Sequence, residues 1–411
     1  MFRRQHWIPP SALIFAQLSH GASWLILLWA GVSGSSESLD FRAIAWIHTV
    51  ALGWATVAAL AVLVHVVPRF ADVTWKMERV ARGSLGAFAV GVLLFVAALL
   101  IYPRAIVFAA GLLVISLLTY VAAALATLRQ AQQGERTERA IARALATTFA
   151  FLAVTALFGF ALSFLISGYR VPSWVADLPA AHANLGMLGW LTLLIFGVST
   201  RTVRPITGNK SRFVAAHIAT GSFAVTGAVL LALGLGSWHA LLVPGAALFG
   251  LAILIYVLDM VDILRRTIVP RSAAQGFLAA AIIWLVCGSA IGAATLSGKP
   301  WQLAYGFLIL AGWVGQMLNA HVYHIGVRLL LTIYRGEDDE TRPHEVLDLR
   351  LSWGSFAAFQ FAVLSGGYGL LMNSPGAIAI AGFSGLAGWV LMIFNLVLVR
   401  TRASETTTSP R

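Results

Sequence analysis

Charged residues are scarce in this sequence. Asp, Glu, Lys and Arg make up 11% of the 411 residues, hydrophobic residues make up 59%, and the mean hydropathy is +0.84. A soluble domain carries roughly 25% charged residues. Because so few polar side chains could not cover a water-soluble surface, the sequence predicts an all-α integral membrane protein with lipid around most of the chain.

Cysteine is nearly absent as well. Cys287 is the only one and lies within an apolar run, which excludes a disulfide framework and a cysteine-based metal site.

The first apolar run, residues 11–31, is long enough to span a bilayer and lacks a small-residue cleavage site. We therefore expect it to form a membrane helix rather than a cleaved signal peptide.

Carboxylates are missing from the interior of the apolar runs. Fourteen of the 16 acidic residues lie between the runs or in the tail, and Asp259 and Asp262 lie at one end of a run. Proton- and cation-coupled transporters usually keep a carboxylate in mid-membrane, where its costly burial is retained for function. Its absence argues against such a transporter.

Long apolar runs are what the sequence has in quantity. A helix needs about 20 apolar residues to cross a bilayer. Twelve such runs occur near residues 11–31, 43–67, 84–102, 105–128, 143–168, 180–200, 213–235, 240–263, 273–296, 302–330, 353–373 and 376–399. They predict a domain of twelve transmembrane helices over residues 1–402, followed by a disordered cytoplasmic tail at 403–411.

The basic residues divide unevenly between the two sides that this topology defines. Of the 28 lysines and arginines, 24 fall on the side of the N-terminus, and only Arg42, Arg104, Arg170 and Lys299 fall on the other. Loops rich in Lys and Arg stay in the cytoplasm. We therefore expect a multi-pass protein of a bacterial-type inner membrane, with both termini cytoplasmic. The net charge of +12 then reflects orientation, and nucleic acid is not an expected partner.

A Gly-Trp pair recurs in the second, sixth and tenth runs. The pairs begin at Gly53, Gly189 and Gly312, at intervals of 136 and 123 residues, and each interval holds four runs. This spacing predicts three four-helix units in series, at about 11–128, 143–263 and 273–399. The alternative is coincidence, because the chain has 38 glycines and 14 tryptophans.

Histidine is the polar residue that the apolar runs do contain. Neutral imidazole is a common ligand of haem iron and copper, although a single buried histidine is more often hydrogen-bonded to a neighbouring helix. As a group, the histidines predict at least one haem or metal site. Seven of the ten lie within runs: His20, His48, His65, His182, His217, His321 and His324.

Depth divides these histidines into two candidate sets for binding a cofactor or metal. His48 and His182 lie near the outer surface in the predicted topology, whereas His321 and His324 lie deeper and one helical turn apart. At 1.5 Å per residue, His48 and His321 differ in depth by roughly 15 Å, so they are not expected to bind the same iron. The first pair is the better candidate, and the second is the alternative.

The stretch from Ala181 to Trp190, followed by Gly197 and Arg201, resembles the large subunit of haem–copper oxidases and nitric oxide reductases. It is most similar to their short, divergent relatives, including the NnrS-type proteins linked to nitric oxide tolerance. Residues 48–68 and 312–328 share the resemblance. The resemblance implies twelve helices in three four-helix arcs, with His48 at the position of a haem ligand and His182 at that of a copper ligand.

The sequence departs from that family at the oxygen-reducing centre. Ala183 follows His182 where the family has a His-Pro-Glu-Val-Tyr pattern, and His217 stands alone in the seventh run, where the family has a histidine pair. In the tenth run, Tyr305 occupies the depth at which the family places its haem ligands. These departures predict that oxygen is not reduced to water.

The sequence thus favours a membrane protein that binds haem, copper or both, in respiratory metal or nitric oxide handling and electron transport. Membrane lipid and other respiratory-chain subunits are the expected partners. Two alternatives stay open: a transporter of a small solute or metal ion, and a subunit or assembly factor of a respiratory complex with no site of its own. Whether the chain is an enzyme also stays open.

Overall fold

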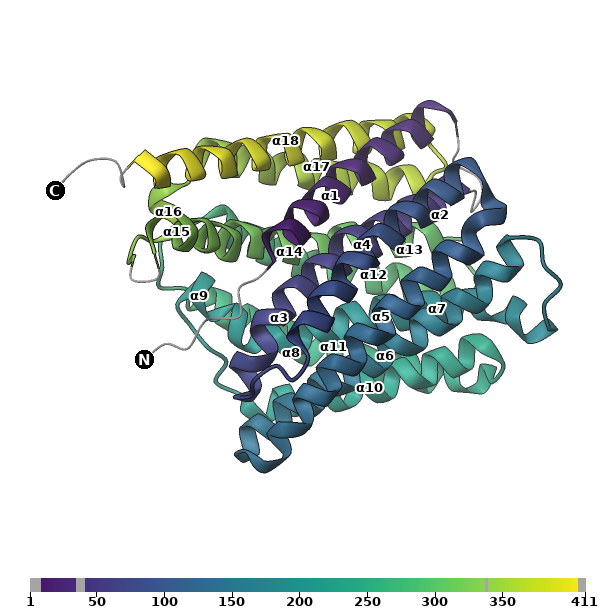
Figure 1. Cartoon of the computed structure of the whole chain (residues 1–411). Coiled ribbons are helices and arrows are strands. Elements are labelled where there is room, and N and C mark those ends of the chain that lie inside the picture. The colour runs from purple at the N-terminus through teal and green to yellow at the C-terminus, as the bar shows by residue number, and fades with distance from the viewer. Residues whose placement is uncertain (1–8, 35–40, 337–338, 406–411) are drawn as a thin grey trace. The chain divides into compact units, whose positions relative to one another are not determined.

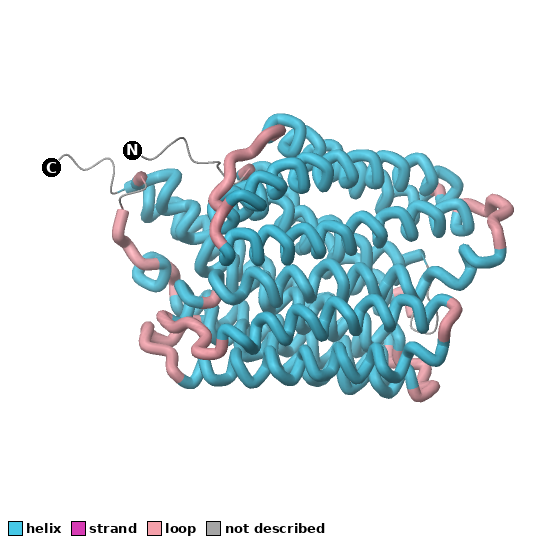
Figure 2. Tube along the Cα trace, turned by 90° about the horizontal axis from the view of Figure 1, so that it is seen from below, coloured by secondary structure: helices cyan, strands magenta, loops and turns pink. Residues whose placement is uncertain are grey.

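The computed structural model describes residues 9–34, 41–336 and 339–405, and in these ranges every regular element is a helix and no strand occurs (Figures 1 and 2). Eleven helical segments of the described chain are long and apolar enough to cross a membrane. Each of the twelve predicted apolar runs coincides with a helical segment. The twelfth segment, α17 (Leu349–Leu371), is not among those eleven: it has 23 residues, but it is rich in serine and glycine. The chain is therefore an all-α, multi-pass membrane protein.

The described chain divides into two compact units, and the first contains residues 9–20, 41–197 and 215–256. Its elements are the first half of α1 (Pro10–Val32), α2 (Phe41–His48), η1 (Thr49–Thr56), α3 (Val57–Ala71), α4 (Glu78–Ile101), η2 (Pro103–Ala105), α5 (Ile106–Leu128), η3 (Arg129–Gln133), α6 (Arg136–Ile166), η4 (Ser173–Asp177), α7 (Leu178–Asn184), η5 (Leu185–Thr192), the first half of α8 (Leu193–Thr202), η6 (His239–Leu241), and most of α10 (Val214–Gly236) and α11 (Leu242–Arg265).

The second unit contains residues 21–34, 198–214, 257–336 and 339–405. Its elements are the second half of α1, the ends of α8 and α11, α9 (Arg204–Thr207), α12 (Ala273–Leu296), α13 (Gln302–Phe307), η7 (Leu308–Val314), α14 (Gly315–His321), η8 (Val322–Gly326), α15 (Val327–Arg335), α16 (Pro343–Val346), α17 and α18 (Pro375–Glu405). Helices α17 and α18 lie side by side as an antiparallel pair (Figure 1).

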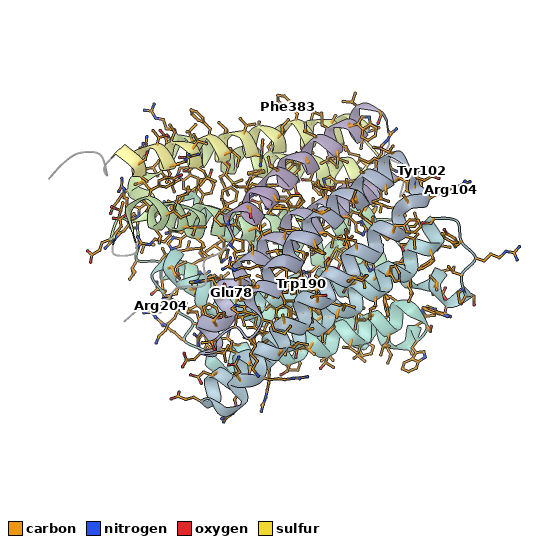
Figure 3. The ribbon with its side chains drawn as sticks, viewed as in Figure 1. Glu78, Tyr102, Arg104, Trp190, Arg204 and Phe383 are labelled. Atoms are coloured by element: carbon orange, nitrogen blue, oxygen red, sulfur yellow. The ribbon has the colours of Figure 1, made fainter. Side chains whose placement is uncertain are left out.

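Large apolar side chains are exposed along the helices of both units. Phe108 and Ile115 on α5 are 76% and 67% exposed, and Phe383 on α18 is 66% exposed and points away from the neighbouring helices (Figure 3). Within the first unit, Glu78 lies at one end of α4, and Tyr102 and Arg104 lie at the other. Apolar flanks with polar ends are what a helix requires when its sides contact lipid.

Local capping decides where several helices begin and end. The polar segment at 129–143, between two of the predicted apolar runs, is largely helical, because Glu135 and Glu138 form a capping box that starts α6 at Arg136. The predicted disordered tail at 403–411 begins inside α18, where Ala403 is buried and its carbonyl accepts from Arg335 Nε at 3.4 Å. Residues 406–411 lie outside the described residues.

The three Gly-Trp pairs lie in π-helical segments, η1, η5 and η7. Each tryptophan is buried, at 2% exposure or less. Each glycine faces a side chain of the membrane helix that precedes its own. A Cβ atom at Gly53 would lie 2.9 Å from Ser19 of α1, one at Gly189 would lie 2.5 Å from Phe151 of α6, and one at Gly312 would lie 2.8 Å from Trp284 of α12. All three sites thus need a residue without a side chain.

Candidate functional site

His48 and His182 lie next to each other in the first unit. Their ring centres are 6.1 Å apart and their planes differ by 16°. His48 is the last residue of α2, directly before the π-helical η1, and His182 lies in α7, three residues before the π-helical η5. Single π-helical turns in membrane and soluble helices often mark functional positions. The structure therefore brings together the two histidines that the sequence favoured.

The same ring nitrogen is hydrogen-bonded to a main-chain carbonyl in both residues. His48 Nδ1 lies 2.8 Å from the Ile44 carbonyl oxygen, and His182 Nδ1 lies 3.0 Å from the Thr155 carbonyl oxygen of α6. A carbonyl oxygen can only accept, so Nδ1 carries the proton in each ring. The lone pair of each neutral imidazole is then on Nε2, the arrangement that histidine ligands of metals use.

Two neighbours shape the space around the pair. The ring of Phe95, on α4, lies 5.1 Å from that of His48 at an angle of 51°. On the other side, a Cβ atom at Gly159 of α6 would lie 2.8 Å from His182 Cε1. Both histidines are only half-buried. Gly159 therefore leaves room for the His182 ring.

Hydrogen bonds hold the two histidine-bearing segments in place. Trp190 Nε1, in η5, donates to Thr56 Oγ1, in η1, at 2.9 Å, and the indole also stacks on Phe149. The Trp190 side chain lies in the interior (Figure 3). Asn184 Nδ2 donates to the Ala228 carbonyl of α10 at 3.1 Å. Because these groups are buried, breaking either contact would leave a polar group unsatisfied, which keeps the segments in register.

The alternative candidates, His321 and His324, lie in the second unit and have different surroundings. His321 Nδ1 lies 2.7 Å from the Met317 carbonyl oxygen, and its Nε2 accepts from Thr202 Oγ1 at 2.8 Å, so both ring nitrogens are occupied. His324 lines a cavity instead. The π-helical η8 begins at Val322, directly after His321, and contains His324.

Two other histidines have different surroundings. His20 is fully buried and stacks on Trp54, with ring centres 3.5 Å apart and planes 5° apart. His239 is exposed, and its Nδ1 lies 3.0 Å from the Gly234 carbonyl oxygen. His239 thus shares the Nδ1 contact of His48 and His182 but has no second imidazole stacked beside it.

The donor set of the pair limits what it could hold. Within residues 9–34, 41–336 and 339–405, no three His, Cys, Asp or Glu side chains come together in a way that could hold a metal ion. The Nε2 atoms of His48 and His182 are the two groups of this pair that could bind a copper ion or a haem iron, and their ring centres lie 6.1 Å apart.

Three residues that contact the histidine pair, Phe95, Thr155 and Gly159, have little or no signal in the sequence. The carbonyl of Thr155 has no sequence signature, because every residue carries one. Phe95 is one of 23 phenylalanines. Gly159 gives a weak signal, since a glycine between Phe158 and Phe160 in an apolar helix suggests close approach of another group.

Two comparisons with known proteins found no relative of this chain. No protein-family model matches the sequence, and no curated protein matches it either.

Proposed function

We propose that this chain is a divergent relative of the haem–copper oxidase large subunit that binds one haem or one copper ion through His48 and His182. The observation that carries the proposal is the stacked pair itself, in which both Nδ1 atoms contact carbonyl oxygens and both Nε2 atoms are left as the ligating nitrogens. The contact of Nδ1 with a carbonyl oxygen also occurs at His239 and His321, so the feature that distinguishes this pair is the second imidazole beside the first.

The arrangement of the helices supports the oxidase-like part of the proposal. At 23 residues, α17 is long enough for a twelfth crossing. The π-helical segments η1, η5 and η7 each carry a Gly-Trp pair, and each glycine packs on the membrane helix just before it. The same local arrangement at intervals of four spans supports three four-helix units in series. The excess of basic residues on one side, 24 of 28, supports both termini in the cytoplasm.

The chemistry proposed for the site is the binding of a small ligand or the transfer of an electron. A bound haem or copper would supply the redox-active or ligand-binding centre. The protein supplies two neutral imidazoles, fixes their tautomers through Ile44 and Thr155, and leaves the pair partly open. Respiratory metal or nitric oxide handling, without oxygen reduction and alongside other respiratory-chain subunits, is the role that this site and the resemblance favour together.

Metal and haem analysis of the purified protein tests the proposal. The pyridine haemochrome spectrum reports haem, and elemental analysis reports copper and iron. We expect a stoichiometric amount of one of them in the wild type. His48→Ala and His182→Ala should each lose it, because one remaining imidazole does not hold the metal, while His239→Ala should retain it. A wild-type protein free of haem and copper, or metal retained by both variants, would show that the pair serves only helix packing.

A further inference from the structure

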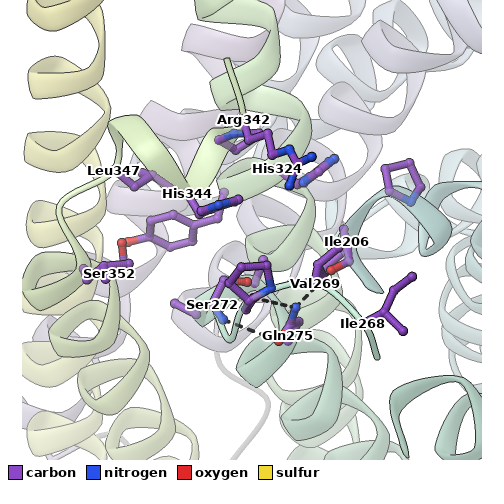
Figure 4. Close-up of a pocket in the computed structure, with 17 residues that line it drawn as sticks. Ile206, Ile268, Val269, Ser272, Gln275, His324, Arg342, His344, Leu347 and Ser352 are labelled. Carbon is purple, nitrogen blue, oxygen red and sulfur yellow. Dashed lines mark hydrogen bonds between the residues drawn. The ribbon is translucent and has the colours of Figure 1, made fainter. Parts of the chain in front are cut away.

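A second candidate site lies in the second unit, independent of the histidine pair. It is a cavity of about 420 Å³ bounded by α9, the start of α12, η8, α16 and the start of α17 (Figure 4). This volume is in the range of small-molecule sites. Its polar lining residues include Ser272, Gln275, Tyr323, His324, Arg342 and His344.

The charge of the lining has one sign. Arg342 and the imidazoles of His324 and His344 lie along one side of the cavity, and no Asp or Glu is among its lining residues. Arg328, four residues after His324, adds a further positive charge nearby and donates to the Thr341 carbonyl at 3.3 Å. A cavity whose described lining has one arginine, two imidazoles that can donate through an N–H group and no carboxylate favours an anion.

Three carboxylates of the neighbouring segment, those of Asp339, Glu345 and Asp348, are engaged in local contacts. Glu345 accepts from the main-chain N–H of Arg342 at 3.2 Å. Asp348 accepts from the N–H groups of Arg350 and Leu351 at the start of α17, at 2.9 and 3.1 Å. Asp339 accepts from the Thr341 hydroxyl at 2.7 Å. These contacts hold Glu345 and Asp348 at the starts of α16 and α17, and hold Asp339 against Thr341.

The opposite side of the cavity is the N-terminus of α12. Ser272 caps this helix, and Ala273 and Ala274 of its first turn line the cavity. The Gln275 side chain holds this turn in place, because its Nε2 donates to the carbonyls of Ile206 at 3.2 Å and Pro270 at 3.1 Å (Figure 4). The first N–H groups and the positive end of the helix dipole attract anions.

We propose that this cavity binds a phosphate group, between Arg342 with the two imidazoles on one side and the N-terminus of α12 on the other. Positive and N–H donors on opposite sides suit a tetrahedral oxyanion, which presents oxygens in several directions, better than a planar carboxylate. The phosphate group could come from a soluble phosphate ester or from the headgroup of an anionic lipid, and both present the same chemistry to the cavity.

Binding measurements on the purified full-length protein test this inference and distinguish the two sources. Calorimetry in dodecyl maltoside would measure binding of inorganic phosphate and glycerol 3-phosphate. Native mass spectrometry would measure retention of phosphatidylglycerol against phosphatidylcholine. Binding of a soluble probe identifies a soluble ester, and selective retention of phosphatidylglycerol identifies a lipid headgroup.

Arg342→Gln is the test variant, and Arg350→Gln is the matched control, because Arg350 is also exposed but lies outside the cavity lining. Losing a charge-assisted hydrogen bond should weaken binding by about tenfold or more in Arg342→Gln, whereas Arg350→Gln should bind as the wild type does. Absence of binding by all probes to the wild type, or equal weakening in both variants, would overturn the inference. Metal content should not change in either variant, which separates this outcome from that of the histidine pair.

Discussion

At the scale of single residues, the histidine pair depends on small groups that leave space and fix orientation. Gly159 allows the His182 ring to approach α6, and the Thr155 carbonyl on the same helix sets the tautomer of that ring. Outer contacts of this kind orient a ligand without touching the metal. The ligand geometry is thus determined as much by α6 as by the helix that carries His182.

Gly159→Ala tests this dependence. The new methyl group would lie 2.8 Å from His182 Cε1, so the ring must move and its contact with Thr155 must weaken. We expect the affinity for the bound haem or copper to fall by about 10- to 100-fold, as measured by competition with a chelator or by haem loss to apomyoglobin. Gly111→Ala is the control, because its Cβ would make an ordinary contact of 3.7 Å with Phe160. Equal affinities in the two variants would contradict the role given to Gly159.

The sequence predicted which histidines to consider but only part of their environment. His48 and His182 could be paired from their similar depth in runs two and six. His321 and His324 could be named together from their spacing of one helical turn, but the π-helical η8 that contains His324 has no recognisable sequence pattern. The contact of His321 with Thr202 joins residues 119 positions apart, which no single-sequence argument reaches.

At the scale of elements, the π-helical segments with their Gly-Trp pairs are the recurring feature. In each, the glycine allows a neighbouring helix to pack closely and the tryptophan is buried. The spacing of the pairs along the chain was visible in the sequence. Their π-helical backbone was not, since hydropathy is the same for both kinds of helix. Helix starts set by capping, such as that of α6 at Arg136, also lay outside what hydropathy could predict.

Gly312→Ala tests the packing role of these segments. Its Cβ would lie 2.8 Å from Trp284 Cβ, and overpacking a tight interior usually costs ~1–3 kcal/mol of stability. We expect a lower midpoint of thermal unfolding in detergent. The control is Gly306→Ala in the adjacent α13, where no atom lies within 4 Å of the added Cβ. If Gly312→Ala unfolds at the same temperature as Gly306→Ala or higher, the glycine is not needed for close approach.

At the scale of the whole molecule, lipid contact and charge distribution decide how the chain lies in the membrane. The helices expose large apolar side chains along their sides, as a protein surrounded by lipid requires. Orientation is predicted only by the basic residues, 24 of which fall on one side of the proposed topology. Hydropathy alone predicted the all-helical, multi-pass fold, because the bilayer leaves so few other ways to satisfy the backbone.

Cysteine labelling on the two sides of α12 tests the orientation. In a Cys287→Ser background, Lys299→Cys should react with a membrane-impermeant maleimide in intact cells, and Arg271→Cys should react only after the cells are permeabilised. Both positions are exposed and flank the same helix, so their accessibility differs by side alone. Labelling of Arg271→Cys but not Lys299→Cys in intact cells would reverse the proposed topology.

The central claim is that His48 and His182 ligate one metal centre together. X-ray absorption fine structure of the purified protein, at the copper or iron edge, tests this most directly, because imidazole rings give a recognisable scattering pattern. The wild type should show two imidazole nitrogens at about 2 Å from the metal. His182→Ala reconstituted with excess metal should show one. A spectrum without imidazole scattering, or one that is unchanged in both His48→Ala and His182→Ala, would contradict the claim.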